Sequence, residues 1–143
     1  MTRDEIIERA RSYCGAKVVF RGRSGRSIDC LGLVVLVAGL EGTEFDRTDY
    51  LPERVQGGDL REGLVRAGFE PLEVGAAEPG DLLTFFWWQK RDGIERHCGI
   101  LTGDGRMVHA TDATGIVQEV QHRGRWESLT VGAYRFPGVE EAA

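Results

Sequence analysis

An almost uninterrupted apolar run from Cys30 to Leu40 is the feature that most constrains how this 143-residue chain folds. Several residues of the run are β-branched, which alone would allow a strand, but the run is longer than most strands. Asp29 precedes it and can cap a helix, and Gly42 follows it and can end one. The sequence therefore predicts a buried helix that starts at Cys30, where a polar loop meets it.

The other patterns predict helices first and strands afterwards. Thr2 and Glu5 have the spacing of a capping box and begin a helix over residues 2–13. The amphipathic segment 59–67, capped by Asp59, predicts a further helix. Alternating or aromatic-rich segments predict strands at 82–88, 97–102, 106–110, 116–120 and 133–136. Helices followed by an antiparallel sheet indicate an α+β domain.

Composition excludes several classes of protein. The net charge of -5 argues against nucleic acid as the main partner, because phosphate binding needs clustered Lys and Arg. No apolar run reaches the ~20 residues of a membrane span, and the N-terminus lacks a signal-peptide core, so we expect synthesis in the cytoplasm and no membrane insertion. Three cysteines without paired spacing predict free thiols and no structural zinc site. The length fits one domain over 1–143, with 139–143 as a flexible tail.

Three side chains can form a catalytic group around the start of the buried helix. Cys30 would lie where free backbone N–H groups and the helix dipole stabilise a thiolate. His97 begins a strand and His109 lies on the strand that returns after the turn at 103–105, so an odd loop length puts both imidazoles on one face. His97 could then act as the base and His109 could orient it. On these residues alone, a buried structural thiol and structural histidines remain open alternatives.

Four sequence blocks carry a resemblance to a known family. Asp-Cys-Leu-Gly-Leu at 29–33, Ala-Glu-Pro-Gly-Asp-Leu-Leu at 77–83, His-Cys-Gly-Ile at 97–100 and Val-His-Ala at 108–110 stand in the order of the NlpC family of peptidoglycan endopeptidases, which the chain resembles from Ile6 to about Pro137. The resemblance implies a papain-like fold whose nucleophile opens a helix. It implies Cys30 as nucleophile, His97 as base and His109 as the orienting residue, with no metal or organic cofactor.

The finer features resemble the phage-tail and gene-transfer-agent branch of that family, whose members are described as cell wall peptidases of the tail tip. These features are the Asp-Cys-Leu-Gly-Leu variant, Tyr-Leu-Pro at 50–52, Tyr-Arg-Phe-Pro at 134–137 and the lack of a cell-wall-binding module. The resemblance implies cleavage of the peptidoglycan stem between γ-D-glutamate and a diamino acid, to aid DNA delivery through the cell wall. It implies other tail-tip or hub proteins as partners, and action in the periplasm or cell wall.

The chain departs from the family pattern at two positions. Leu31 stands where a small Ser follows the nucleophile, and Val18 stands where the family often has a Tyr near the oxyanion site. A missing hydroxyl donor would weaken stabilisation of the tetrahedral intermediate by about one to a few kcal/mol. Backbone N–H groups at Cys30 could still serve that purpose.

Two other functions remain open from the sequence. Segment 83–88 alternates apolar side chains on both faces, which are either buried or form a docking surface, as in a non-catalytic tail-tip subunit with the same fold. A Cys/His amidase on the same fold is the second alternative. Trp126 is expected to be a core or edge aromatic.

Several polar or reactive residues receive no catalytic role in this interpretation. The basic segment from Arg21 to Arg26 is either a solvated turn or a contact for an anionic ligand. Cys14 and Cys98 are expected to be bystanders, with Cys98 on the strand face opposite the base. His122 lies in a polar stretch and is expected to be exposed.

Overall fold

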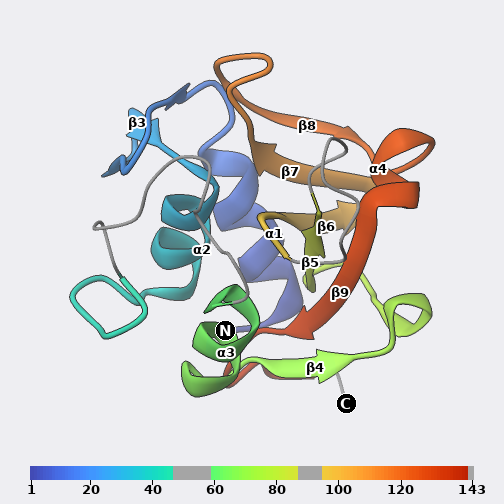
Figure 1. Cartoon of the computed structure of the whole chain (residues 1–143). Helices are drawn as coiled ribbons and strands as arrows, with labels where there is room; N and C mark the ends of the chain where they lie inside the picture. Colours follow the sequence, from blue (N-terminus) through green and yellow to red (C-terminus); the bar gives the residue numbers. More distant parts are fainter. Residues whose placement is uncertain (47–58, 87–94, 142–143) are drawn as a thin grey trace.

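The computed structural model describes residues 1–46, 59–86 and 95–141, and in it helices pack on an antiparallel sheet (Figure 1). Helices α1 and α2 contact each other and strand β6, while α3 contacts the edge strand β4. The predicted α+β fold, with Cys30 at the start of a helix, is confirmed. The helices are α1 (Arg3–Ser12), α2 (Cys30–Ala38), α3 (Asp59–Arg66) and α4 (Arg125–Leu129), with a 3-10 turn η2 at Val74–Ala76.

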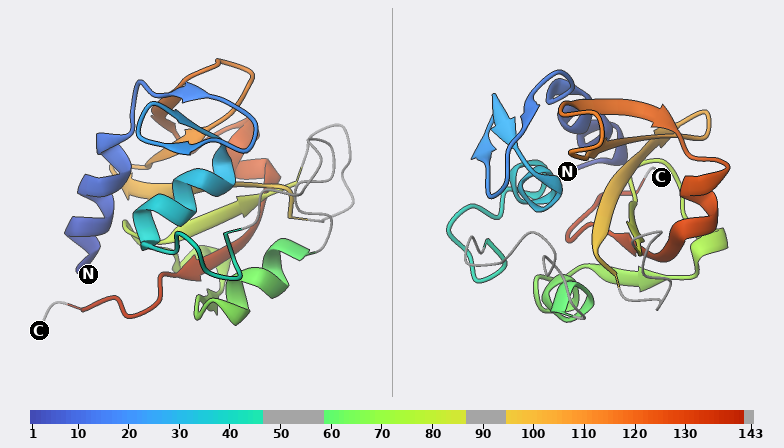
Figure 2. Two further views of the ribbon diagram at one scale, coloured as in Figure 1. Left: turned by 90° about the vertical axis from the view of Figure 1, so that its left-hand side faces the viewer. Right: turned by 45° about the horizontal axis from the view of Figure 1, so that its top comes forward.

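Within the described residues, one sheet has the strand order β4-β9-β5-β6-β7-β8, and each neighbouring pair is antiparallel. A smaller sheet, in the order β1-β3-β2, lies beside the start of α2 (Figure 2). The strands are β1 (Lys17–Val18), β2 (Arg23–Ser24), β3 (Ser27–Ile28), β4 (Glu70–Leu72), β5 (Leu82–Phe85), β6 (His97–Gly103), β7 (Arg106–Ala110), β8 (Val117–Gln121) and β9 (Thr130–Arg135).

Helix α2 forms as the apolar run predicts, and its two ends have clear causes. The Asp29 carboxylate accepts a hydrogen bond from the Gly32 N–H at 2.8 Å, which satisfies a first-turn donor. Gly39 adopts the left-handed conformation with φ 69° and is the C-cap. The prediction that Gly42 ends the helix is wrong, because the backbone already turns left-handed at Gly39.

Both ends of the chain are tied to the fold and to each other. Helix α1 has the predicted cap, since Thr2 Oγ1 accepts from the Glu5 N–H at 3.1 Å. The Glu140 N–H donates to the Met1 carbonyl at 2.8 Å, and the Glu141 carboxylate forms an ion pair with Arg3 of α1 at 3.1 Å. The segment expected to be a flexible tail is therefore anchored through Glu141, and residues 142–143 lie outside the described part.

Other predicted boundaries need correction. Strand β5 ends at Phe85, and Trp87 and Trp88 lie outside the described residues, as does the block at 50–52. Asp59 is the first residue of α3 and not its cap. Strands β1 to β4 and helix α4 were not predicted. None of the helices in the described residues is long and apolar enough to cross a membrane.

The large sheet has a hydrophobic cluster on each face. Leu82 and Ile100 join the apolar residues of α1 and α2 on one face. On the other face Leu83 and Met107 pack with Leu129 of α4. Strand β6 contacts both α1 and α2, so α2 and its first residue lie against this strand.

Candidate active site

Cys30 is the first residue of α2, and the turn before it is fixed by one carboxylate. The Cys30 residue is 9% exposed. Asp29 caps the helix through Gly32, and its other oxygen accepts from the Arg21 N–H at 2.8 Å. Arg23 Nη1 donates to Asp29 Oδ1 at 2.9 Å. The thiol is therefore held at a rigid helix start, where the dipole and unpaired N–H groups favour negative charge.

One arginine of the basic segment before the helix has a structural role. Arg23 Nε also donates to Asp46 Oδ1 at 2.8 Å, so this guanidinium bridges two carboxylates, and its side chain is only 15% exposed. Arg26 is exposed on the turn between β2 and β3. Of the two interpretations left open, contact with an anionic ligand does not suit Arg23, which already neutralises Asp29.

His97 and His109 meet on one sheet face, as the hairpin geometry predicts. In the β6–β7 register Gly99 lies opposite His109, so His97 is two residues away on the same face. His97 Nε2 and His109 Nδ1 are 2.9 Å apart, and each residue is 2% exposed. A Cβ at Gly99 would lie 3.2 Å from the His109 Cβ, so the missing side chain leaves room for the two rings to meet.

Burial and the contact between the two imidazoles indicate which ring nitrogen donates and which accepts. Burial, followed by the charge of His97, lowers the pKa of His109 to about 3, so His109 is neutral near pH 7. A neutral His109 can accept from the His97 Nε2–H through its Nδ1 lone pair. His97 also lies near Cys30 and lowers the pKa of that thiol, and the imidazole nitrogen that does not meet His109 is Nδ1. The structure thus brings the three predicted residues together.

Cys30 has the electrostatic surroundings of a reactive thiol. The neighbouring Cys98 thiol, then the neighbouring His97 imidazole and its charge, lower the pKa of Cys30 to about 6 against the opposing effect of burial. A thiol with such a pKa is mostly thiolate at neutral pH, which is the nucleophilic form. The site can therefore attack an electrophilic carbon and then return a proton from the neighbouring imidazole.

Cys98 is not the bystander that strand alternation suggested. Its thiol donates to the Cys30 carbonyl oxygen at 3.3 Å. His97 and Cys98 point to opposite sheet faces, yet both reach Cys30. Cys30 therefore lies at the start of β6, where side chains from both faces are within reach.

An aromatic wall, Phe85 and Trp126, closes one side of the imidazole pair. The Trp126 ring centroid is 5.6 Å from that of His97 and 4.7 Å from that of His109. Phe85 is 5.7 Å from His97 and 5.5 Å from Trp126. His122, expected to be exposed, is half-buried beside Phe85 at 6.0 Å. This wall excludes water from one side of the imidazoles.

A buried carboxylate fixes the chain just before His97. Glu95 is 7% exposed and accepts from Thr84 Oγ1 at 2.7 Å and from the Tyr134 hydroxyl. Gly132 permits this approach, because a Cβ there would lie 2.3 Å from Glu95 Oε1. The segment that leads into β6 is thereby tied to β5 and β9.

Sequence reasoning missed Cys98, Trp126 and Glu95 as parts of the site. A Cys immediately after the base was visible in the sequence, but no spacing rule linked it to Cys30. Trp126 lies on a five-residue helix that no pattern predicted. At the two positions that depart from the family pattern, Leu31 is buried in the core at 4% exposed and Val18 is half-buried.

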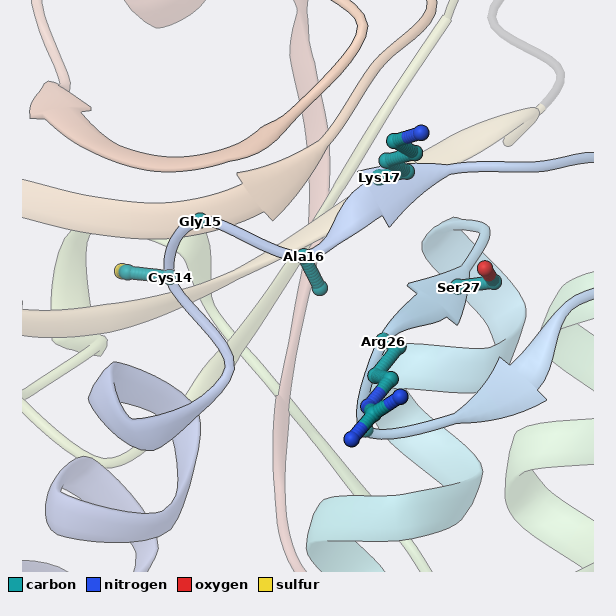
Figure 3. A pocket seen from close by; sticks show the side chains of 7 residues that line it. Cys14, Gly15, Ala16, Lys17, Arg26 and Ser27 are labelled. Carbon is teal, nitrogen blue, oxygen red and sulfur yellow. The ribbon is translucent and has the colours of Figure 1, made fainter.

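A surface hollow elsewhere contains none of these residues. It is lined by Cys14 to Lys17 and by Gly25 to Ser27, on the small sheet (Figure 3). In the part of the chain that the structure describes, no three His, Cys, Asp or Glu side chains are arranged to hold a metal ion.

Known proteins resemble this chain in sequence and in fold. The model of a family described as NlpC/P60 matches residues 15–135. The probable endopeptidase p60 of Listeria monocytogenes is 28% identical over 127 residues, which are 89% of this chain and 22% of that protein. The gamma-DL-glutamyl hydrolase of Bacillus subtilis is 26% identical over 137 residues, which are 94% of this chain and 29% of that protein.

Solved structures share the fold. An NlpC/P60 family protein from Bacillus cereus has a TM-score of 0.70 at 22% identity, covering 95% of this chain and 40% of that one. The NlpC/p60 domain of the peptidoglycan hydrolase SagA has a TM-score of 0.65 at 21% identity, covering 94% and 98%. The chain spans about a quarter of the length of the curated relatives that it matches.

Proposed function

Because the chain belongs to the NlpC/P60 family, we propose that it is a cysteine endopeptidase that cuts the peptide stem of peptidoglycan. One observation carries the proposal. At the start of a buried helix Cys30 has its pKa lowered by His97, and His97 Nε2 lies 2.9 Å from His109 Nδ1. A nucleophile, a base and an orienting group placed together in this order are the elements of a cysteine peptidase.

In this mechanism the Cys30 thiolate attacks the scissile carbonyl, and the carbonyl oxygen becomes an oxyanion. Val18 offers no hydroxyl, so the backbone N–H of Cys30, at the first helical position, is the donor that stabilises the oxyanion. Protonated His97 gives its proton to the leaving amine and then takes one from water, which hydrolyses the thioester. His109 stays neutral and accepts from His97 throughout, which keeps the reacting nitrogen directed at Cys30.

The bond we propose lies between γ-D-glutamate and the diamino acid of the stem. The support is the sequence resemblance of the blocks around Cys30 and His97, together with the similarity to a gamma-DL-glutamyl hydrolase over most of this chain. A cut at this bond leaves N-acetylmuramic acid attached to L-alanine. An amidase would separate those two, so the products distinguish the reactions.

We further propose that the chain works in a phage tail or gene-transfer agent. In this proposal it is made in the bacterial cytoplasm, joins a tail tip or hub, and acts in the periplasm or cell wall during DNA delivery. The Asp-Cys-Leu-Gly-Leu block at 29–33 and the closing Tyr-Arg-Phe-Pro block at 134–137 support this branch. Chromatography with purified tail-tip and hub proteins tests it, and a monomer that binds none of them would contradict it.

Purified sacculi test the catalytic proposal. We expect the wild-type protein to release muropeptides cut after γ-D-glutamate, as measured by mass spectrometry. Cys30→Ala should release none, whereas Cys14→Ala should match the wild type because Cys14 is exposed and lies away from the site. An inactive wild-type protein, or full activity in Cys30→Ala, would overturn the proposal and favour a non-catalytic role.

A further inference from the structure

A buried carboxylate joins the segment that leads into β6 to two strands of the large sheet. Glu95 is 7% exposed, and its Oε1 atom accepts hydrogen bonds from Thr84 Oγ1 of β5 at 2.7 Å and from the Tyr134 hydroxyl of β9. Since β5 lies between β6 and β9, the Glu95 side chain reaches over one strand to the next. Acidic side chains are seldom buried this deeply unless they are hydrogen bonded, and here two hydroxyl donors hold one oxygen in place.

The sheet is irregular at the point where this carboxylate lies. Gly132 of β9 is opposite Thr84, and the register between β5 and β9 shifts between Thr84 and Phe85. A Cβ at Gly132 would lie 2.3 Å from Glu95 Oε1, so a residue without a side chain leaves the space that the carboxylate fills. Irregular strand pairing often occurs next to active sites, where it redirects a side chain. The local shape of β9 therefore accommodates Glu95.

The hydrogen bonds around the carboxylate have a fixed direction. Burial, followed by the hydrogen bond to Glu95, raises the pKa of Tyr134, so the phenol keeps its proton and donates to the carboxylate. The phenol oxygen accepts in turn from Arg61 Nη1 of α3 at 3.2 Å. A chain of donors thus runs from a cation through a phenol to Glu95, and hydrogen bonds that involve a charged group are stronger than those between neutral groups.

The chain between Glu95 and His97 is held on β5. The Arg96 N–H donates to the Phe85 carbonyl at 2.8 Å, and Phe85 lies opposite His97 in the β5–β6 register. Glu95 bonds to the residue before Phe85, so a side-chain bond and a backbone bond fix the start of β6 on the same strand. The His97 ring meets His109 at 2.9 Å, and this contact depends on where the backbone at the start of β6 lies.

We propose that Glu95 and Tyr134 form a positioning pair that holds the start of β6 and thereby keeps the His97 imidazole in its contact with His109. Neither residue touches the substrate in this role, and both act through His97. The inference rests on the proposed function for its effect on catalysis, whereas the placement of His97 is a property of the protein without substrate.

Alkylation of Cys30 by iodoacetamide reports the placement of His97, because a nearby imidazole stabilises the thiolate. The rate is measured against pH by mass spectrometry of the Cys30 peptide. Tyr134→Phe removes one hydroxyl and keeps the ring, and we expect it to raise the midpoint by about half a pH unit, which is roughly threefold less thiolate at pH 5. Tyr13→Phe, at a half-buried tyrosine that ends α1, is the matched control and should change nothing. A Tyr134→Phe profile that matches the wild type would overturn the proposal.

Variants of Glu95 test whether the hydroxyl acts through the carboxylate. Glu95→Gln keeps an acceptor of the same size and should shift the midpoint less than Glu95→Leu, which has none. In the Glu95→Leu protein, Tyr134→Phe should cause no further shift, because the hydroxyl has already lost its acceptor. Additive shifts, or equal shifts in the Gln and Leu variants, would overturn the proposal. If Glu95→Leu does not fold, Thr84→Val removes the other donor with little change in shape and should shift the midpoint as Tyr134→Phe does; an unshifted profile would again count against the pair.

Kinetics on soluble muropeptides separate placement of the base from binding of the substrate. We expect Tyr134→Phe to lower kcat about threefold and to leave KM unchanged. A raised KM with an unchanged kcat would contradict the proposal, because the pair would then act on substrate binding. A shifted Cys30 midpoint in a protein whose wild type leaves sacculi intact would count against the endopeptidase and not against the positioning pair.

Discussion

Arg23→Ala tests whether the active-site helix depends on the ion pairs at its start. Arg23 donates to Asp29 at 2.9 Å, to Asp46 at 2.8 Å and to the Gly22 carbonyl at 2.9 Å. The side chains of Arg23, Asp29 and Asp46 are 15%, 12% and 16% exposed, so water only partly replaces the lost contacts. The substitution leaves two largely buried carboxylates without their shared cation.

The magnitude follows from this burial. Removing one partner of a fully buried ion pair costs about 3–5 kcal/mol, whereas an exposed pair contributes about 0–1 kcal/mol. Side chains this close to full burial belong near the lower end of the first range, so we expect a loss of about 3 kcal/mol in the free energy of unfolding. For a chain of this length that corresponds to a decrease of roughly 10 °C in Tm.

Urea unfolding followed by circular dichroism measures the difference directly. Arg26→Ala is the matched control, because Arg26 is an exposed arginine in the same segment, and we expect it to change the free energy by less than about 0.5 kcal/mol. If Arg23→Ala and Arg26→Ala unfold at the same urea concentration, the ion pairs do not hold the helix start and the reasoning is wrong.

Three further predictions follow from buried contacts. The pKa of His109 is lowered to about 3 by burial and by the neighbouring imidazole, so on acidification the unfolded protein binds a proton at His109 before the folded protein does. The free energy of unfolding should therefore decrease by about 1.4 kcal/mol per pH unit as the pH falls from about 6.5 toward 3, and His109 should add no pH dependence above about 6.5. His109→Gln should lack this slope in acid titrations of Tm. Gly132→Ala would place a Cβ 2.3 Å from Glu95 Oε1 and should lose about 1–3 kcal/mol in urea unfolding, whereas Gly75→Ala, with no atom within 4 Å, should lose almost none. Trp126→Leu removes the ring contacts to both imidazoles and should lower kcat about fivefold with little change in KM. An unchanged kcat would show that the aromatic wall does not help to hold His97 in place.

Local signals in the sequence were sufficient to predict the start of the helix that carries Cys30. Asp29 before an apolar run predicts a cap and a helix start, and the structure has both. The end of the same helix was misplaced because Leu40 extends the apolar run past Gly39, and apolar composition cannot show where the backbone turns left-handed. A side chain that hydrogen bonds to a backbone group a few residues away can be recognised from the sequence, because both partners lie in the same short segment.

Short elements gave no signal because their stability comes from tertiary contacts. Strand β4 contains Pro71, which is tolerated there because β4 is, among the described strands, an edge strand paired with β9 alone. Helix α4 has five residues, too few to show a helical period, and is held by Leu129 in the core below Trp126. The aromatic wall beside the imidazoles was therefore invisible from the sequence.

The alternation of side chains along a strand explains both the success at His109 and the failure at Cys98. Alternation assigns faces correctly within the β6–β7 hairpin, where the register places His97 and His109 together. It says nothing about a group that lies beyond the end of a strand, and Cys30 lies there, near His97 and with its carbonyl oxygen 3.3 Å from the Cys98 sulfur. Consecutive residues on opposite faces can therefore act on one residue. A nucleophile placed at the end of a strand receives a base from one face and a hydrogen-bond donor from the other, which is an arrangement that no single helix or strand could supply.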